Sequence, residues 1–491
     1  MSAAPARVCA YAVLRRVFER DSYADRALQA ESRRLDARDR ALAMRLAYGA
    51  IQRRLTLDHL IERLAERPPD RLDAAVLASL RLGLYELLYL RGAPDRAVVA
   101  DAVELAKSAR SGGHGLVNAV LRRAAREGAG ALLGDLDEQT PEDAAVMHSH
   151  PPWLARMWWE QLGPERARAL MTANNEPGEF ALRANPLRCA EATGLSEQSQ
   201  TAPPRELATR DPVARELAAR DLLAGELDEL GVRAHVDREL PEALVLDSPL
   251  DLHATAAWRQ GRAIAQSRAA MLVARVLDPA PGERVLDLCA APGGKSTHLA
   301  ALMRGDGEVV AVERNPARAR ELRATVARLG AGGCVRVEVG DAATPRPAGQ
   351  SFDRVLVDPP CSGLGTLQAH PDLRWRWPIE DPTDRGSVPE RLAQMVAIQR
   401  AILAAGAAAV RPGGTLVYST CTISVLENER QMEQFLSKDS GFELEDLTSQ
   451  WPSHPDPAHP RYLQTLPDRD RTAGFFIARM RRIATPKRGR L

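Results

Sequence analysis

The sequence lacks the features that mark membrane, secreted and zinc-binding proteins. No stretch approaches the roughly 18 uninterrupted apolar residues of a membrane-spanning helix, and the N-terminus has no apolar signal core. The six cysteines form no Cys-x-x-Cys pair and no cluster with histidine at zinc-ligand spacing. These absences predict a cytoplasmic protein with free thiols, without a metal site and without membrane contact.

Lysine is also scarce, since it occurs only four times, at positions 107, 295, 438 and 487. Arginine therefore carries most of the positive charge, and Lys295 within a glycine turn is a candidate functional residue. Residues 1–126 contain 23 Arg and Lys against 15 Asp and Glu, a net charge of +8, whereas the remainder carries −7. A basic front half favours contact with phosphates, although a solvated helical surface would have the same composition.

The length of 491 residues and the periodicity of the apolar positions predict several domains. Residues 5–127 carry helical stripes broken by Pro68-Pro69 and Gly92-Ala93-Pro94, which predicts a bundle of about six helices. The predicted organisation is an all-helical domain over 1–130, a linker over 131–150, a small α+β connecting or RNA-binding region over 151–267, an α/β domain over 268–480 and a loose basic tail over 481–491. A weak repeat within 196–222 predicts an inserted surface helix or a partly disordered insert.

The α/β domain is predicted from strands that alternate with helices. The expected strands are 284–288, 308–312, 334–339, 353–357, 415–419 and 474–479, and the expected helices are 295–304, 316–329 and 391–410. Such alternation predicts an open, mostly parallel, doubly wound sheet with helices on both faces.

The stretch RVLDLCAAPGGKST (284–297) runs from a strand into a glycine turn that could hold a nucleotide-type cofactor. A phosphate-binding P-loop would need glycine where Cys289 stands, and no G-x-G-x-x-G spacing occurs. S-adenosylmethionine has no phosphates but needs close approach to the backbone, which Gly293 and Gly294 permit. The turn therefore favours S-adenosylmethionine over the phosphate-binding alternatives.

Acidic residues at two further strand ends suit the adenosine part of that cofactor. Glu313 is placed to accept from both ribose hydroxyls, and Asp341 could accept from the adenine amino group. A lone acid at a strand end is usually solvated, but acids that end successive strands in one crevice favour a cofactor site.

Two cysteines follow later strands, Cys361 in VLVDPPCSGLGT and Cys421 in GGTLVYSTCT. Carbon 5 of a pyrimidine is a poor nucleophile, but addition of a thiolate at carbon 6 makes an enamine that accepts a methyl group. Asp358 could bind the amidine edge of the ring, on a loop stiffened by Pro359 and Pro360. The chemistry alone leaves open which cysteine attacks; a buried structural role suits Cys289 and Cys334 better.

With these residues the chain resembles the RNA cytosine-5 methyltransferases of the Sun/Fmu family, and among them the bacterial enzymes that act on small-subunit ribosomal RNA. RDRALAMRLAYGAIQRRLTLDHLI (38–61) and GLVNAVLRR (115–123) resemble the NusB-like RNA-binding module of that group. The resemblance covers about residues 5–480. It implies a Rossmann-like S-adenosylmethionine methyltransferase domain, mostly parallel and doubly wound, behind an all-α NusB-like domain.

The resemblance also implies roles for single residues. Cys421 would be the nucleophile, Cys361 would help to expel the product, and Lys295 would sit near the reacting base. The residues implied to contact S-adenosyl-L-methionine or the target site are Cys289, Ala290, Ala291, Pro292, Gly293, Gly294, Lys295, Glu313, Asp341 and Asp358. The implied product is 5-methylcytidine in 16S ribosomal RNA, made by a cytoplasmic monomer on naked or early-assembly RNA, with no metal and no membrane.

Two family motifs are altered in this chain. The acidic stretch before the first strand is Gln266-Ser267-Arg268, and the late motif Thr472-Ala473-Gly474 lacks its acid. Extra residues stand at 196–222 and 379–389. The alternatives are a catalytically silent RNA-binding assembly factor, a cytosine-5 methyltransferase for transfer RNA, and a DNA enzyme that would attack with the cysteine of the Pro-Cys motif, Cys361.

Overall fold

The computed structural model describes residues 3–90, 92–108, 112–134, 136–188, 212–347, 349–377 and 389–483. The chain forms two compact units, one of Met1–Pro177 with Thr366–Glu390 and the other of Gly178–Gly365 with Arg391–Leu491. The predicted inserts at 196–211 and 379–388 and the tail from 484 onward lie outside the described residues.

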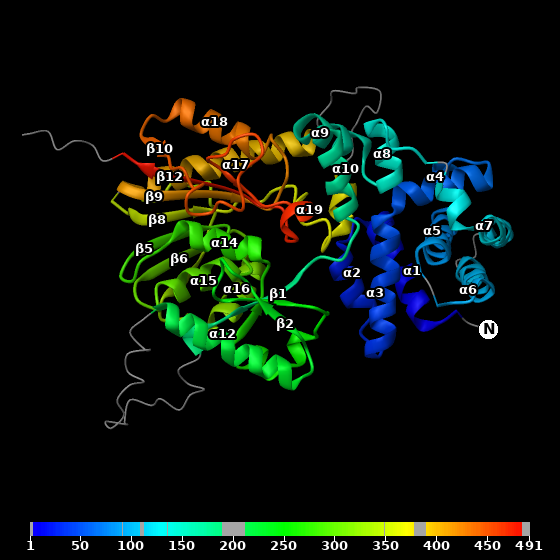
Figure 1. Cartoon of the computed structure of the whole chain (residues 1–491), viewed down its shortest axis with the longest axis horizontal. Helices are drawn as coiled ribbons and strands as arrows, with labels where there is room; N and C mark the ends of the chain where they lie inside the picture. The colour runs from blue at the N-terminus through cyan, green and yellow to red at the C-terminus, as the bar shows by residue number, and fades with distance from the viewer. Residues whose placement is uncertain are drawn as a thin grey trace, which may run out of the picture. The chain divides into compact units, whose positions relative to one another are not determined.

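In its described residues the first unit is all-helical, as predicted, and its front part has seven described helices, α1 to α7, where about six were expected (Figure 1). Asp36 and Asp73 begin two of these helices by accepting backbone N–H groups, as N-caps do. The helices are α1 (Pro5–Arg20), α2 (Ala24–Glu31), α3 (Ala37–Gln52), α4 (Arg54–Ala65), α5 (Ala74–Tyr89), α6 (Asp95–Ser108), α7 (His114–Gly134), α8 (Pro141–His148), α9 (Pro152–Leu162) and α10 (Pro164–Ala173), with the 3-10 helix η1 (Pro69–Arg71).

Helix α8 occupies residues 141–148, and the prediction of a linker over 131–150 is therefore wrong for this stretch. Its Ala144 and Ala145 are buried, and the Thr56 hydroxyl of α4 donates to the carbonyl of Val146 at 2.6 Å. An eight-residue helix offers too few apolar positions for the periodicity of the sequence to reveal it.

The segment after Gly365 leaves the α/β domain and packs in the helical unit. Its 3-10 helix η4 (Pro371–Trp375) holds Arg374, whose side chain is fully buried. The guanidinium donates to the carbonyls of Ser149 at 3.0 Å and Asn174 at 3.1 Å, and Trp375 donates to the carbonyl of Ile51 at 2.7 Å. The α/β domain predicted over 268–480 is therefore interrupted, because these partners all belong to the helical unit.

The second unit contains two sheets. The larger has the strand order β10-β12-β9-β8-β5-β6-β7, with β11 paired to β12. Strands β9, β8, β5, β6 and β7 are parallel, and β12 and β10 are antiparallel, which confirms the predicted mostly parallel sheet. Its strands are β5 (Arg284–Leu288), β6 (Glu308–Glu313), β7 (Val335–Val339), β8 (Phe352–Val357), β9 (Val410–Thr420), β10 (Phe442–Leu444), β11 (Leu463–Gln464) and β12 (Phe476–Arg482).

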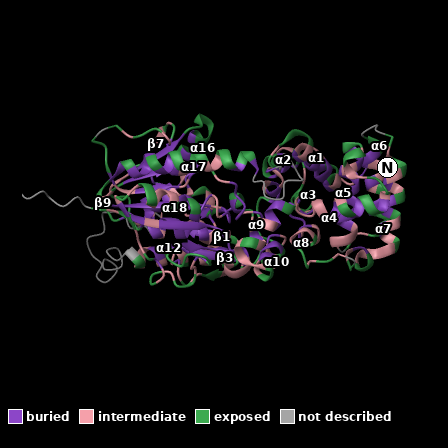
Figure 2. Cartoon of the chain, turned by 90° about the horizontal axis from the view of Figure 1, so that it is seen from above, coloured by how far each residue is buried: buried purple, intermediate pink, exposed green. Residues whose placement is uncertain are grey.

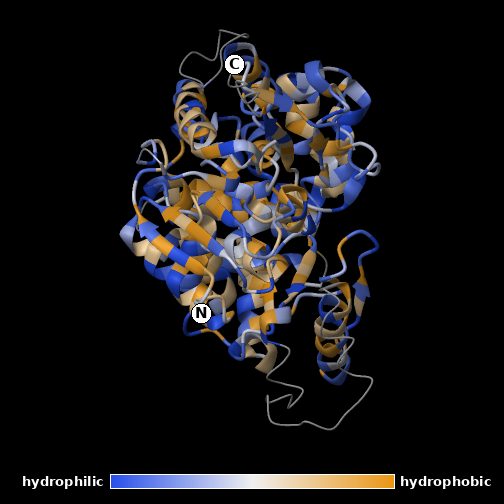
Figure 3. Ribbon diagram, turned by 90° about the vertical axis from the view of Figure 1, so that its left-hand side faces the viewer, coloured by the Kyte–Doolittle hydropathy of each residue, from blue (hydrophilic) through white to orange (hydrophobic). Residues whose placement is uncertain are grey.

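Neighbouring residues of the parallel strands point to opposite faces, and both faces are buried, as Figure 2 shows in purple. Val285 and Val309 pack with helices α14 (Arg268–Leu277), α15 (Gly294–Leu302) and α16 (Pro316–Arg328). Leu286 and Val310 pack on the other face with α17 (Glu390–Ala409) and α18 (Glu429–Lys438). The helices carry both hydrophobic and hydrophilic residues (Figure 3), which agrees with this sandwich.

Helix α17 is long and apolar enough, by length and composition, to cross a membrane. Its Ile402, Leu403 and Ala407 are nevertheless buried against the large sheet. The packing explains the apolar composition as that of a core helix.

The smaller sheet is antiparallel in the order β2-β3-β1-β4. Its strands are β1 (Phe180–Ala184), β2 (Ala234–Val236), β3 (Ala243–Leu246) and β4 (Ala263–Ala265), accompanied by η2 (Pro186–Arg188), α12 (Pro212–Glu229), η3 (Leu252–Ala254) and α13 (Ala256–Arg259), while α19 (Pro467–Asp470) precedes β12. Ala219, Leu223 and Leu227 of α12 are buried against this sheet. The predicted surface insert is therefore, over residues 212–222, part of a packed helix.

Candidate active site

The candidate site lies where the parallel sheet reverses its strand order. Strand β5 is flanked by β6 on one side and β8 on the other, so successive connections run in opposite directions from it. In doubly wound sheets such a point leaves a crevice at the carboxyl ends of the strands. Cys289, Asp358 and Cys421 directly follow β5, β8 and β9, at these carboxyl ends.

The two predicted reactive cysteines lie in contact. The Sγ atoms of Cys361 and Cys421 are 3.2 Å apart, and both side chains are half-buried. The hydrogen bond with Cys421 and burial raise the pKa of Cys361 well above its usual value. Cys361 is therefore held as a neutral thiol that can carry a proton beside the other sulfur.

Lys295 and Asp358 form an ion pair in the same crevice. The Lys295 Nζ donates to Asp358 Oδ2 at 2.7 Å and lies 5.1 Å from the centre of the Phe475 ring. Burial lowers the pKa of Lys295, but the charge and hydrogen bond of Asp358 outweigh it, and Cys421 adds to them, so the pKa is raised. An ammonium group thus stands near both the candidate nucleophile and the candidate base-binding carboxylate.

Asp287 of β5 was not among the predicted site residues, yet it lies just before the turn. Its carboxyl is buried, and Oδ2 accepts from the Ser296 hydroxyl at 2.5 Å. Burial raises the pKa of Asp287 to about 7. Burial also raises the pKa of Cys289 to about 12, with further contributions from the charges of Asp358, Asp287 and Glu313. Three carboxylates therefore converge on the turn after β5.

The turn itself, which contains Ala290, Ala291 and Pro292, needs glycine for its shape. Gly293 has a φ of +105°, and a Cβ atom there would lie 2.7 Å from Leu322 Cδ1. Gly294 is braced from β1, since its carbonyl accepts from the buried Arg183 at 2.6 Å. Sequence reasoning missed Arg183, because its link to the turn spans 111 residues.

The two acids predicted for the adenosine part stand at the next strand ends. Glu313, which ends β6, is 5% exposed, and its Oε1 accepts from the backbone N–H of Asn315 at 2.7 Å. Asp341 follows β7 and is exposed, with Oδ1 accepting from the N–H of Ala343 at 3.0 Å. Glu313 belongs to the group of converging carboxylates, whereas Asp341 lies further out on the rim of the sheet.

The residues present fit an S-adenosylmethionine-type group. Asp287 Oδ1 is buried and has no hydrogen-bond partner among the described residues, and the glycine turn beside it has no side chain at Gly293 or Gly294. The acidic acceptors stand at the strand ends beside a turn that is not a phosphate-binding loop, which suits hydroxyl and amino donors. Within the described residues no group of three or more Asp, Glu, His or Cys side chains could hold a metal ion.

The two altered motifs have structural partners. Arg268 pairs with Glu179 at 2.8 Å and with Asp237 at 3.0 Å, so its charge is compensated. Gln266 Oε1 accepts from Arg183 at 2.6 Å, and the Thr472 hydroxyl donates to Glu179. Both motifs therefore brace the edge of the crevice in this chain.

Comparisons with known proteins show which family the chain belongs to. The family model described as 16S rRNA methyltransferase RsmB/F matches residues 274–481, and the NusB family model matches residues 4–126. A probable ribosomal RNA small subunit methyltransferase B of Synechocystis sp. is 34% identical, covering 97% of this chain and 99% of that protein. The corresponding probable enzyme of Bacillus subtilis is 32% identical, covering 92% of each chain.

Solved structures show the same architecture. The crystal structure of PH0851 matches with a TM-score of 0.74 and 26% identity over 98% of this chain and 99% of that one. NSun6 from Pyrococcus horikoshii, solved with SFG, matches in fold with a TM-score of 0.54 and 23% identity over 68% of this chain and 99% of that one. The chain therefore belongs to the ribosomal RNA small subunit methyltransferase B family, whose members are RNA methyltransferases.

Proposed function

We propose that this chain transfers a methyl group from S-adenosyl-L-methionine to carbon 5 of a cytosine in 16S ribosomal RNA through a covalent adduct with Cys421. The observation that carries the proposal is the contact of 3.2 Å between the sulfurs of Cys361 and Cys421. Only one thiol is needed to attack the ring, so a second thiol in contact with it supports a separate role in release.

The chain's own residues can perform the attack on the ring and the release of the product. The Cys421 thiolate adds to carbon 6 of the cytosine, and the ring electrons move toward carbon 5 and the amidine edge, which Asp358 hydrogen-bonds. When bound, the cofactor supplies an electrophilic methyl group on a positively charged sulfur. Solvent water takes the proton from carbon 5, the electrons of that C–H bond restore the double bond between carbons 5 and 6, and the Cys421 sulfur leaves. The Cys361 thiol can protonate this leaving sulfur at contact distance.

The cofactor would be held by the turn after β5 and by the converging carboxylates. Gly293 and Gly294 admit the cofactor close to the backbone, Glu313 accepts from the ribose hydroxyls, and Asp341 on the rim accepts from the adenine amino group. Lys295 holds Asp358 in place at 2.7 Å. NSun6, which has a similar fold, was solved with SFG, and this supports an S-adenosylmethionine-type cofactor.

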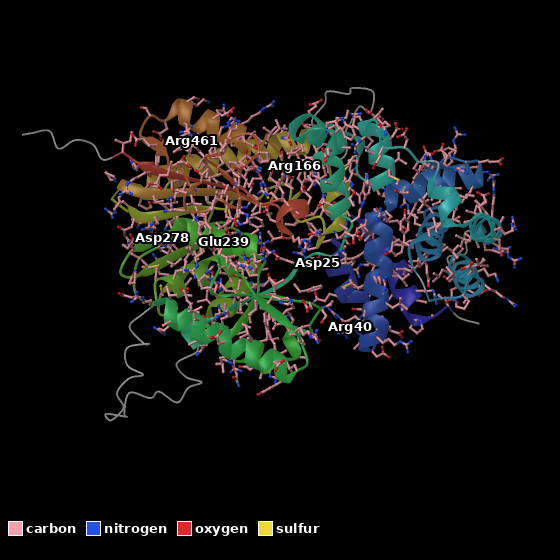
Figure 4. All side chains as sticks on the ribbon, in the orientation of Figure 1. Asp25, Arg40, Arg166, Glu239, Asp278 and Arg461 are labelled. Atoms are coloured by element: carbon pink, nitrogen blue, oxygen red, sulfur yellow. The ribbon has the colours of Figure 1, made fainter. Side chains whose placement is uncertain are left out.

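The helical unit would supply RNA affinity. Four arginines, Arg33 and Arg34 between α2 and α3 and Arg38 and Arg45 within α3, are exposed and form no ion pair with another described residue. Arg40, labelled in Figure 4, lies among them in the first turn of α3. Such unpaired guanidinium groups suit phosphates, and their replacement by glutamate should weaken RNA binding and reduce its salt dependence. The substrate would be naked or early-assembly RNA in the cytoplasm. The enzyme would bind it as a monomer.

The test is incorporation of labelled methyl groups into small-subunit ribosomal RNA, followed by bisulfite sequencing to locate 5-methylcytosine. Wild type should modify a cytosine of 16S RNA, whereas Cys421→Ala should not. Equal incorporation by both proteins would overturn the role of Cys421. Modification of transfer RNA alone would overturn the proposed substrate, and RNA binding without cofactor affinity would overturn the enzymatic function.

A further inference from the structure

A buried carboxylate joins the two loops that carry the cysteines. Glu427 lies in the turn between β9 and α18, and none of its side chain is exposed. Its Oε1 accepts from the backbone N–H of Ser362 at 2.8 Å, and its Oε2 accepts from the Ser362 hydroxyl at 2.5 Å. Ser362 directly follows Cys361, so this carboxylate grips the first cysteine loop at two points.

The same carboxylate is bound to the second cysteine loop. The hydroxyl of Thr422, which directly follows Cys421, lies 2.7 Å from the Ser362 hydroxyl and 3.4 Å from Glu427 Oε2. The Tyr418 hydroxyl of β9 donates to the Glu427 carbonyl at 2.7 Å, which anchors the turn. The residues that follow the two cysteines, Ser362 and Thr422, therefore both contact the Glu427 carboxylate.

A third element completes the arrangement. Gln399, buried in α17, donates through Nε2 to Glu427 Oε1 at 2.9 Å and to the carbonyl of Pro360 at 3.0 Å. Pro360 precedes Cys361, so the loop is held on both sides of the sulfur. A buried carboxylate usually needs an ion pair, but no Lys or Arg of the described chain pairs with Glu427. Its partners are instead a backbone N–H group, two hydroxyls and the side-chain amide of Gln399.

We propose that Glu427 is a positioning residue that holds the Cys361 and Cys421 loops in register and keeps the two sulfurs in contact. The effect of Glu427 on catalysis rests on the proposed function. Its effect on the position of the two thiols does not. The Glu427 charge has a second effect, because it contributes to the raised pKa of Cys361, after the Cys421 hydrogen bond and burial. The carboxylate thus also favours the neutral thiol at Cys361 and leaves attack to Cys421.

The test compares Glu427→Gln with Glu429→Gln. Glutamine is nearly isosteric but replaces one acceptor oxygen by a donor that faces N–H or O–H groups, and it removes the charge. Glu429 is a matched control, since it is a buried carboxyl two positions further along the chain. It contacts neither Ser362 nor Thr422. Ser362→Ala is a second variant, which removes one hydroxyl and leaves the backbone donor.

The first readout is alkylation of the free enzyme by iodoacetamide, with the two cysteine peptides quantified by mass spectrometry. We expect wild type and Glu429→Gln to react mainly at Cys421. Glu427→Gln should raise the share of Cys361 severalfold, because the loosened loop makes that thiol more accessible and the lost carboxylate charge no longer raises its pKa. This readout needs neither RNA nor cofactor, so it judges the positioning role even if the proposed function fails.

The second readout is methyl transfer to 16S RNA. Glu427→Gln should lower kcat on the order of a hundredfold, as expected when reacting groups are displaced by about 1 Å, and leave KM for the cofactor within about twofold. Ser362→Ala should lower kcat less and add little when combined with Glu427→Gln. An unchanged cysteine ratio in a folded Glu427→Gln protein, or an equal change in Glu429→Gln, would overturn the proposal.

Discussion

The Nζ atom of Lys295 lies 2.7 Å from Oδ2 of Asp358, with the Phe475 ring on a further side of the ammonium group. The pair joins the turn after β5 to the loop after β8, the two strands that flank the reversal of the sheet. A lysine side chain in the crevice therefore orients the carboxylate that is proposed to bind the target base.

Replacement of Lys295 by methionine keeps most of the length of the side chain but removes its charge. We expect kcat to fall on the order of a hundredfold, because Asp358 loses its partner and its orientation. Lys438→Met, at an exposed position of α18, is the control and should behave as wild type. Methyl-transfer kinetics at saturating cofactor measure the effect; a Lys295→Met enzyme with wild-type kcat would contradict it.

Asp287 should make stability depend on pH. Burial raises its pKa to about 7 in the folded protein, whereas unfolded aspartates titrate near 3.9. Because the folded state holds this proton more tightly, its contribution to stability is complete below about pH 4 and is lost as the pH rises through about 7.

Asp287→Asn should therefore gain stability relative to wild type between pH 5 and pH 8, by at most about 1.4 kcal/mol per pH unit. Urea unfolding at the two pH values measures the difference in the free energy of unfolding. Parallel pH profiles for the two proteins would show that this carboxyl titrates normally.

Gly293→Ala should loosen the cofactor turn. An L-residue at a φ of +105° is strained, and the added Cβ would meet Leu322 Cδ1 at 2.7 Å. The cost is about 1–3 kcal/mol, and we expect cofactor affinity to fall accordingly in calorimetry. Gly332→Ala serves as the control, since no atom lies within 4 Å of its added Cβ and its φ is not positive. Equal cofactor affinity in both variants would count against a role for the turn.

Arg374→Met should destabilise the helical unit. Its guanidinium is fully buried and donates to backbone carbonyls of Ser149 and Asn174, which methionine would leave without that donor. The loss should amount to about 2 kcal/mol or more in the free energy of unfolding. Arg71→Met, at an exposed site of the same unit, should change it by less than about 0.5 kcal/mol. Equal stability of the two variants would show that the η4 segment is only loosely docked.

Much of the α/β domain could be predicted from the sequence because its signals are local. The stretch RVLDL (284–288) and the glycine turn after it predict a strand and a helix start, and β5 and α15 lie there. The residues at the carboxyl ends of successive strands could be expected to converge, since a parallel sheet aligns those ends. Lys295, Asp358, Cys361 and Cys421 accordingly lie in one crevice.

The parts that were missed depend on contacts between distant residues. Glu427 binds a serine 65 residues earlier in the chain, and no local pattern announces that link. Arg374 is buried by partners from residues 52, 149, 174 and 175, so its continuity with the Cys361 loop misled the prediction of its domain. Helix α8 was missed for a local reason, because eight residues are too few to show a helical period.

The most direct test of the central claim is covalent trapping on RNA that contains 5-fluorocytosine at the target position. Fluorine on carbon 5 cannot leave as a proton, so the adduct should persist after methyl transfer. We predict a protein–RNA adduct that forms only with S-adenosylmethionine present and maps by peptide analysis to Cys421. An adduct on Cys361, or full methylation activity in Cys421→Ala, would contradict the account.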